Sequence, residues 1–345
     1  MTPLRVHFLH GLSDHFLDFI RQRIDHPVRI TRNRGDGEPT AEPDLSLPPD
    51  ADFDILVVSG SLERRHLEAS PNLRAVIVPW AGPPPKVCDL LRDFPHIGLH
   101  NLHHNAPATA EMAVALLMAA AKRMYPRERD FRARGWPEKQ WHDITAIQLA
   151  GKSLLLLGYG AIGQRAATAC HALGMRVRAV RRSVERETEI APGLTLHPMG
   201  EWKSLLPLSN ALMICLPGTP ETRGLVGAEE LRALAPPRLF VNVGRGEIAD
   251  ERAVYEALTD GTLEGAGIDV WWSYIDTSKE SQPGAEANRP SRYPFHELDN
   301  VAMSPHRASL SREEKDNRYA DLASLLNAAA AGDPIPNRVD LWRGY

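Results

Sequence analysis

A glycine loop near the middle of this 345-residue chain limits its possible folds more than any other stretch. Four leucines at residues 154–157 predict a buried strand, and Gly158, Gly160 and Gly163 follow it directly. The residues from Gln164 onward have helical composition. In a strand–loop–helix unit of this kind, the first glycine makes the tight turn and the third lets helix and strand pack closely. The pattern therefore predicts a βα unit in a parallel sheet.

The same loop predicts a bound ligand. Gly160 would let the backbone approach a pyrophosphate, and the N–H groups of Ala161, Ile162 and Gly163 at the helix start would favour an anion. A GxGxxG pattern alone is a weak signal, because a glycine-rich βα turn can also lack a ligand. Here the strand, loop, helix and a following strand at residues 176–180 stand in the expected order. The sequence therefore predicts that a dinucleotide binds at this loop.

The end of that following strand indicates which dinucleotide is preferred. Dinucleotide folds usually carry an acidic residue about 20 positions after the loop, where it holds the ribose 2′-hydroxyl. This chain has Arg181, Arg182 and Ser183 there instead. Cations remove the repulsion that a 2′-phosphate would meet and can bind it through charge-assisted hydrogen bonds. The residues predict NADP as the preferred cofactor, with NAD possible; the alternative is that the arginines only form a solvated strand end.

Short apolar runs alternate with helical stretches along the whole chain. The predicted strands lie at residues 5–9, 54–59, 75–78, 154–157, 176–180, 211–216, 239–243, 266–270 and 301–303. Long helices are predicted at residues 108–123, which are rich in alanine and leucine, and at residues 311–331, before Gly332 and Pro334. This alternation predicts an α/β fold with parallel sheets, and the length allows two domains.

Composition argues against several classes of protein. Forty Lys and Arg residues against 44 Asp and Glu give a net charge of −4 without a basic block, so nucleic acid is not an expected partner. Cys88, Cys170 and Cys215 show no CxxC spacing and are expected to be reduced. No apolar run approaches about 18 residues and no leader is evident, so we expect a cytoplasmic protein without membrane contact. The adjacent His103 and His104 lack a third ligand at suitable spacing, and no metal site is expected.

Further motifs, in order along the chain, resemble those of the D-isomer-specific 2-hydroxyacid dehydrogenases, which include glyoxylate/hydroxypyruvate reductases and phosphoglycerate dehydrogenases. Besides the glycine loop they occupy residues 106–123, 149–152, 215–225, 242–246, 267–270, 299–306, 337–340 and 344–345. The resemblance implies two Rossmann-like domains with doubly wound parallel sheets. Residues 1–103 and 309–345 would form a split substrate domain, and residues 104–308 the dinucleotide-binding domain, with the active site in the cleft between them. It also implies a homodimer formed through the cofactor domain.

The resemblance further implies hydride transfer between nicotinamide and a 2-keto or 2-hydroxy acid. Arg245 would bind the substrate carboxylate and polarise the carbonyl, and His306 would act as acid and base. Asp269 would lie near the nicotinamide amide. The remaining expected contacts of the cofactor are Leu216, Pro217, Thr222, Asn242, Val243 and Gly244.

The chain departs from the family pattern beside His306. The family's glutamate that orients the catalytic histidine falls on Tyr274 here. Three replacements remain open: the Tyr274 hydroxyl, a carboxylate of Asp276 or Glu280, or water. The stretch 277–292 is an insertion that forms either a loop over the cleft or inert surface.

The predicted substrate loop is also unusual. The backbone N–H groups of Ala81 and Gly82, after Trp80, would hold the substrate carboxylate, but three prolines without N–H groups follow. Trp80, Trp271 and Trp272 would either narrow the pocket or admit a bulkier, apolar substrate, or would simply pack in a core or interface.

A rival prediction is a dinucleotide-sensing protein that regulates a partner, because a fold does not determine function. The missing glutamate supports this rival. The retained Arg245 and His306 favour the enzyme.

Overall fold

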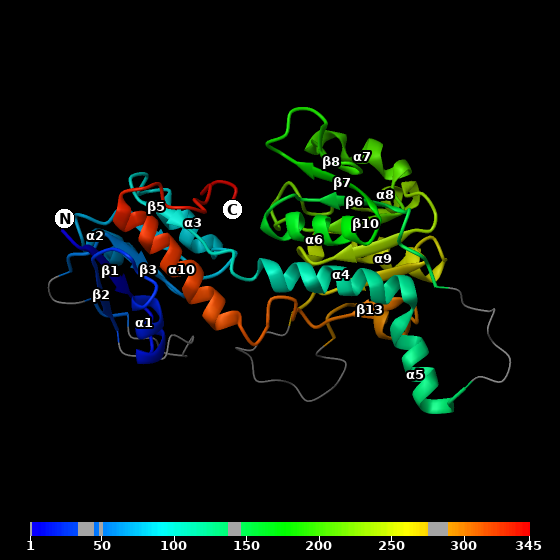
Figure 1. Ribbon diagram of the computed structural model, residues 1–345, viewed down its shortest axis with the longest axis horizontal. Coiled ribbons are helices and arrows are strands. Elements are labelled where there is room, and N and C mark those ends of the chain that lie inside the picture. Colours follow the sequence, from blue (N-terminus) through cyan, green and yellow to red (C-terminus); the bar gives the residue numbers. More distant parts are fainter. Residues whose placement is uncertain (1, 34–44, 48–50, 137–145, 275–288) are drawn as a thin grey trace. The chain divides into compact units, whose positions relative to one another are not determined.

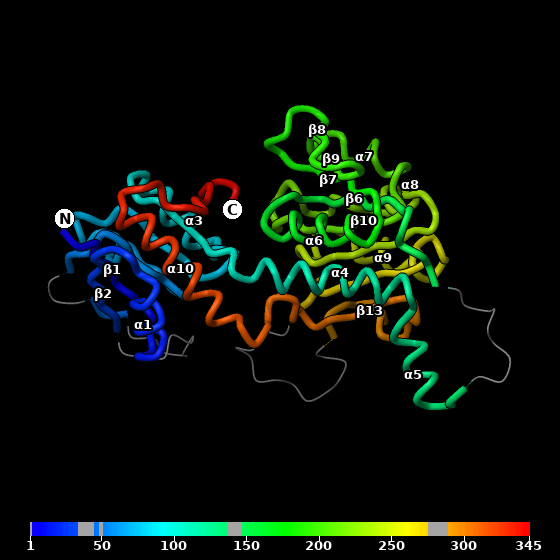
Figure 2. The backbone as a smooth tube through the Cα atoms, in the orientation of Figure 1, coloured from blue at the N-terminus to red at the C-terminus, as the bar shows by residue number. Residues whose placement is uncertain are grey.

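The computed structural model describes residues 2–33, 45–47, 51–136, 146–274 and 289–345 (Figure 1). The chain forms two compact units, one of Met1–Asn105 with Ser311–Tyr345 and one of Ala106–Leu310. The chain enters the second unit at helix α4 (Ala106–Lys122) and re-enters the first before α10 (Glu314–Ala331), as the tube in Figure 2 shows. Each unit has its own parallel sheet and core, so the predicted α/β fold class is confirmed. The functional roles of the two units, and the predicted domain bounds, stay predictions.

The first unit is a five-stranded parallel sheet with helices on both faces. Its strands, in the spatial order β2-β1-β3-β4-β5, are Val28–Arg32, Leu4–Phe8, Ile55–Val57, Ala75–Ile77 and Gly98–His100. Its helices are α1 (Asp14–Arg21), α2 (Arg64–Glu68), α3 (Pro85–Leu91) and α10. Successive strand residues point to opposite faces. Thus Ile55 and Val57 pack with α1 and α10, whereas Leu56 packs with α2 and α3.

The second unit is an eight-stranded sheet in which only the edge pair β8–β9 is antiparallel among the strands described. The order β13-β12-β11-β10-β6-β7-β9-β8 corresponds to Val301–Met303, Gly265–Ile268, Leu239–Asn242, Ala211–Ile214, Ser153–Leu157, Arg176–Arg181, Leu194–Pro198 and Thr188–Ala191. The α-helices besides α4 are α5 (Met124–Arg134), α6 (Ala161–Ala172), α7 (Trp202–Leu205), α8 (Ala228–Ala233) and α9 (Glu251–Thr259). Short 3-10 helices occupy Met199–Glu201, Leu206–Leu208, Gly246–Ile248 and Phe295–Glu297.

The four leucines of β6 explain why this strand lies at the centre of the sheet. Leu154 and Leu156 pack with α4 and α6 on one face, and Leu155 and Leu157 pack with α7, α8 and α9 on the other. A strand buried on both faces needs an unbroken apolar run. From β6 the chain proceeds to β7 on one side and later to β10 on the other. The strand order therefore reverses at β6, and ligands of such sheets bind beyond the carboxyl ends of the strands there.

Several element predictions need correction. The helix predicted at 108–123 is confirmed as α4, but Arg123 has a left-handed φ of 49° and an unpredicted helix, α5, follows. The helix predicted from residue 311 begins at Glu314. The strand predicted at 211–216 ends at Ile214. Four strands, β2, β5, β8 and β9, were not predicted; β8 is an edge strand with mostly exposed side chains and no apolar pattern, whereas the edge strand β2 alternates the half-buried Val28 and Ile30 with polar residues.

No helix among the described residues combines the length and apolar character that crossing a membrane requires.

Candidate active site

The glycine loop between β6 and α6 has the shape that its sequence predicts. Gly158 has a φ of +100°, and a Cβ atom there would lie 2.9 Å from the carbonyl oxygen of Cys215. A Cβ atom at Gly163 would lie 2.0 Å from the Gly158 oxygen. Gly160 is the N-cap of α6, and a Cβ atom added to it would meet no described atom within 4 Å. The turn and the helix packing thus need Gly158 and Gly163, and the open space at Gly160 fits a pyrophosphate at the helix N-terminus.

The cationic segment lies at the carboxyl end of β7, next to the glycine-loop strand. Arg181 is the last residue of β7, and Arg181, Arg182 and Ser183 are all exposed. An exposed guanidinium at this strand end fits the 2′-phosphate of NADP.

The loop after β10 is closed by its own threonine. The Thr222 hydroxyl donates to the Pro217 carbonyl oxygen at 2.8 Å and accepts from the Thr219 N–H at 2.8 Å. Leu216 and Pro217 are half-buried at the strand end. The Thr222 hydroxyl therefore stabilises the loop that carries Leu216 and Pro217, whereas its predicted contact with the cofactor stays a prediction.

Asn242 fixes the turn that carries Arg245. Its side-chain oxygen accepts the Gly244 N–H at 3.0 Å, and its side-chain nitrogen donates to the Arg245 carbonyl oxygen at 3.0 Å. Arg245 itself has extended backbone and an exposed side chain, which donates from Nη1 to the Gly244 oxygen at 2.7 Å. Asn242 and the adjacent buried Val243 thus act through the backbone of this turn.

The two glycines beside Arg245 allow three loops to meet. A Cβ atom at Gly244 would lie 2.5 Å from the Leu216 oxygen, and one at Gly246 would lie 2.2 Å from the Trp271 oxygen. Side chains at either position would push apart the loops that follow β10, β11 and β12. The Arg245 backbone is therefore held between the ends of neighbouring strands.

The buried carboxylate of Asp269, just after β12, organises the loop that carries His306. One carboxylate oxygen accepts the Ser304 hydroxyl at 2.5 Å and the Arg307 N–H at 2.9 Å, and the other accepts the Ala308 N–H at 3.3 Å. The His306 N–H donates to the Asp269 carbonyl oxygen at 2.9 Å. His306 has a left-handed φ of 56°, which this network holds in place. Asp269 is thus a positioning residue for the His306 loop, and its predicted contact with the nicotinamide amide stays a prediction.

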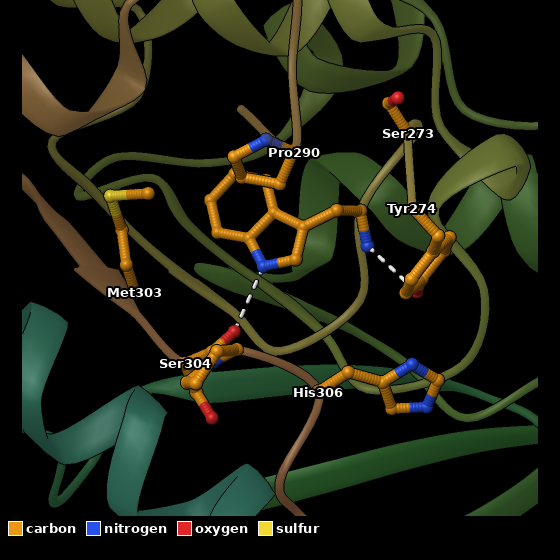
Figure 3. A pocket seen from close by; sticks show the side chains of 8 residues that line it. Ser273, Tyr274, Pro290, Met303, Ser304 and His306 are labelled. Atoms are coloured by element: carbon orange, nitrogen blue, oxygen red, sulfur yellow. Dashed lines mark hydrogen bonds between the residues drawn. The ribbon is translucent and has the colours of Figure 1, made fainter. Parts of the chain in front are cut away.

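Tyr274 lies beside the His306 ring but does not hydrogen-bond to it (Figure 3). The two ring centroids are 5.3 Å apart at an angle of 55°. The Tyr274 hydroxyl accepts the backbone N–H of Trp271 at 3.1 Å. In the described part of the chain no carboxylate contacts the imidazole; Asp276 and Glu280, and most of the insertion, lie outside it. Of the three replacements for the glutamate, the Tyr274 side chain therefore supplies ring contact rather than a hydrogen-bond acceptor.

Burial shifts the pKa values of the two rings in opposite directions, whereas the Arg245 cation lowers both and the Asp269 carboxylate raises both. Burial lowers the pKa of His306 below 6.5; the Asp269 carboxylate opposes this effect, and the Arg245 cation reinforces it. Burial raises the pKa of Tyr274 above 10, although the Trp271 N–H and the Arg245 cation act against it. At neutral pH the imidazole is mostly neutral and the phenol is protonated. His306 can therefore accept a proton readily and donate one best in mildly acidic solution.

Trp271 and Trp272 both belong to the core of the second unit. The Trp271 indole N–H donates to the Ser304 carbonyl oxygen at 2.8 Å, and the Trp272 indole N–H donates to the Ala249 oxygen at 2.7 Å. Trp272 stacks on Phe295 with centroids 5.5 Å apart. Trp272 therefore serves core packing, whereas Trp271 also lines a hollow beside His306.

The predicted substrate loop lies in the first unit, after β4. Neither the Ala81 nor the Gly82 N–H has a hydrogen-bond partner in the part of the chain that the structure describes. The Ala81 carbonyl oxygen accepts from the Asn101 side chain at 2.5 Å, which fixes the loop. The proline stretch starts helix α3 at Pro85, where a missing N–H is harmless. Two N–H groups thus remain available to an anion.

Sequence reasoning did not find the contact between Trp80 and Arg318. The Arg318 guanidinium lies 3.7 Å from the centre of the Trp80 ring, and Glu314 accepts from Arg318 Nε at 2.9 Å. Glu314 also lies within hydrogen-bond distance of His104 Nε2, at 3.1 Å, so this histidine packs against the buried ion pair of Arg318 and Glu314. Among the described residues no cluster of three His, Cys, Asp or Glu side chains is arranged to hold a metal ion.

These features can be compared with those of known proteins. A family model described as "D-isomer specific 2-hydroxyacid dehydrogenase, NAD binding domain" matches residues 114–308. The chain belongs to this family. The resemblance inferred from the motifs is thereby confirmed.

Two relatives and one solved structure show how far the similarity to this chain extends. A glyoxylate reductase of Aeropyrum pernix is 35% identical over 237 residues, which are 68% of this chain and 66% of that protein. A D-3-phosphoglycerate dehydrogenase of Archaeoglobus fulgidus is 32% identical over 237 residues, or 69% of this chain and 41% of that protein. The chain thus spans less than two thirds of the length of these relatives. A D-isomer specific 2-hydroxyacid dehydrogenase from Xanthobacter autotrophicus Py2, solved with NADPH and MES, has the same fold, with a TM-score of 0.72, 24% identity and 100% of both chains covered.

Proposed function

We propose that this protein is an NADP-preferring reductase of 2-keto acids that also catalyses the reverse oxidation of 2-hydroxy acids. The observation that carries the proposal is the arrangement of Arg245 and His306. They follow β11 and β13, whose carboxyl ends lie at the same sheet edge as the glycine loop after β6. A cation and an imidazole beside a dinucleotide site are what carbonyl reduction needs.

The proposed reaction uses these two side chains in distinct roles. The cofactor, when bound, would supply a hydride to the carbonyl carbon. Arg245 would bind the substrate carboxylate and polarise the carbonyl, since its guanidinium is exposed and, among the described residues, hydrogen-bonds only to the Gly244 oxygen of its own turn. Protonated His306 would give its proton to the carbonyl oxygen, which becomes the hydroxyl of the product, and the imidazole would be left neutral. In the reverse direction neutral His306 would accept that proton.

The residues around the glycine loop would hold NADP. The α6 N-terminus at Gly160–Gly163 suits the pyrophosphate, and Arg181, Arg182 and Ser183 suit the 2′-phosphate. The nicotinamide half would lie against the loops after the strands, where the candidate contacts are Leu216, Pro217, Thr222, Val243, Gly244 and Asp269. The NADPH bound in the Xanthobacter structure, which has the same fold, supports this cofactor.

The first unit would supply the rest of the substrate site. Residues 1–103 and 309–345 would form the substrate domain and residues 104–308 the cofactor domain. The N–H groups of Ala81 and Gly82, next to Trp80, have no hydrogen-bond partner within the described part of the chain and would bind the substrate carboxylate. We propose in addition that the protein is a cytoplasmic homodimer.

Mixing the purified protein with NADPH or NADH and glyoxylate, hydroxypyruvate or phenylpyruvate, and following nicotinamide absorbance, tests the activity. We expect turnover of at least one keto acid, with a higher kcat/KM for NADPH than for NADH. Tight NADPH binding without turnover of any keto acid would instead support the dinucleotide-sensing function. Faster turnover with NADH would contradict the cofactor preference.

A further inference from the structure

A mostly apolar hollow lies directly beside His306 (Figure 3). Its volume is about 380 Å³, within the size range of small-molecule sites. Its lining residues are Trp271, Ser273, Tyr274, Pro290, Met303, Ser304, Pro305 and His306. None of these side chains except the imidazole carries a titratable charge near neutral pH. The hollow is therefore suited to an uncharged, apolar group.

One residue, Tyr274, both replaces the family's glutamate and forms a wall of the hollow. The Tyr274 ring forms one wall, and its hydroxyl is turned to the Trp271 N–H. A carboxylate in place of this ring would add a negative charge to a wall of a hollow whose other side chains include Trp271, Pro290 and Met303. The tyrosine thus removes a charge from the wall beside His306 and adds apolar surface.

The hollow adjoins the place where the substrate would react. His306 lines it, so a substrate whose carbonyl oxygen contacts the imidazole holds its reacting carbon at the edge of the hollow. The group attached to that carbon, other than the carboxylate, is then the part that can enter the hollow. A hydrocarbon group there would be stabilised by burial against the apolar walls, whereas a hydroxymethyl group would have mainly the neutral hydroxyls of Ser273 and Ser304 as polar neighbours.

We propose that the preferred substrates are 2-keto acids with a branched or aromatic hydrocarbon side chain, which occupies this hollow. The inference rests on the proposed reductase function. Trp271 and Tyr274 form aromatic walls, and Met303 and Pro305 complete the surface that contacts the side chain.

The first test compares substrates in the NADPH-dependent reaction. We expect kcat/KM for phenylpyruvate and 4-methyl-2-oxopentanoate to exceed the value for glyoxylate and hydroxypyruvate at least tenfold, because a hydrophobic pocket discriminates by roughly 10–200-fold per methylene. Equal or higher kcat/KM for glyoxylate would overturn the inference and leave the reductase function intact.

The second test fills the hollow. Met303→Phe is expected to lower kcat/KM for phenylpyruvate at least fivefold without changing that for glyoxylate, and Met303→Leu is expected to keep most activity on both. Met199→Phe is the matched control, because Met199 packs half-buried against the same core cluster but does not line the hollow. A fall of equal size for all substrates in Met303→Phe would assign Met303 a purely structural role and contradict the inference.

A binding measurement separates this inference from the proposed function. Calorimetric titration of the NADPH-saturated protein, in which a 2-hydroxy acid cannot be oxidised, is expected to give a dissociation constant at least tenfold lower for phenyllactate than for glycolate, and Met303→Phe is expected to abolish the difference. If phenyllactate shows this pattern but no keto acid is turned over, the reductase function fails and the apolar site stands. If phenyllactate binds no more tightly than glycolate, the inference is overturned whatever the turnover.

Discussion

The glycine loop after β6 and the His306 loop after β13 lie at the same sheet edge but are held by different means. Close backbone approaches define the glycine loop, as the 2.0 Å that would separate a Gly163 Cβ from the Gly158 oxygen indicates. Side chains define the His306 loop, through Asp269, Ser304 and Trp271. A loop fixed by backbone packing tolerates few sequences. A loop that several side chains hold can keep its shape even when its histidine lacks one partner, here the glutamate that other family members have.

The largest expected effect is on the histidine side of this comparison. His306→Ala is expected to lower kcat/KM for the preferred keto acid about 10²–10⁴-fold, because the proton donor is removed. The dissociation constant for NADPH should stay within twofold, since the glycine loop has its own support. Rapid kinetics and fluorescence titration measure the two quantities. Near-normal turnover would show that another group donates the proton.

A smaller effect is expected at the cofactor end. Arg181→Ala with Arg182→Ala should weaken NADPH binding about 10–100-fold, which corresponds to the net loss of one charge-assisted hydrogen bond of roughly 1.5–3 kcal/mol. NADH binding should not change. Titration of the double variant with both cofactors measures this. If the binding of NADPH and NADH weakens equally, the arginines stabilise the fold and do not contact the 2′-phosphate.

A change at Asp269 tests whether side chains hold the His306 loop in place. Asp269→Asn leaves one acceptor oxygen for a network in which two oxygens accept from Ser304, Arg307 and Ala308. We expect kcat to fall about tenfold and stability to fall by about 1–3 kcal/mol, from the donors left unpaired in the His306 loop. Stopped-flow turnover and urea unfolding check these values. Lower kcat with unchanged stability would point to direct contact with the cofactor.

The smallest effect is expected at Tyr274. Tyr274→Phe should change kcat less than about threefold, because the hydroxyl contacts only the Trp271 N–H in the described structure. Tyr274→Glu should raise the pKa of His306 by placing a negative charge beside it. Since reduction needs protonated His306, the decline of kcat/KM with rising pH should then occur at higher pH than in the unchanged protein. A pH profile of both variants measures this, and no shift in Tyr274→Glu would exclude charge coupling.

The difference between a loop fixed by backbone packing and a loop fixed by side chains also explains which features could be predicted from the sequence. The β6 leucines, Gly158 and Gly163 are readable because a buried strand and a tight turn each demand a residue type. The contact of Tyr274 with the Trp271 N–H depends on how one irregular turn folds, and the stack of Arg318 on Trp80 joins residues far apart in the chain. No local pattern encodes either. Strand β8 was not predicted because its exposed side chains show no apolar alternation, whereas β2 does alternate Val28 and Ile30 with polar residues and was readable from the sequence.

The left-handed backbone of His306 has a consequence for how such a site is maintained. At a φ of 56° a residue with a Cβ atom is destabilised by about 1–2 kcal/mol relative to an unstrained conformation, whereas glycine is not. His306→Gly should therefore melt at a higher temperature than His306→Ala, although both lack the imidazole. The protein therefore keeps a histidine at a position where selection for thermal stability alone would favour glycine.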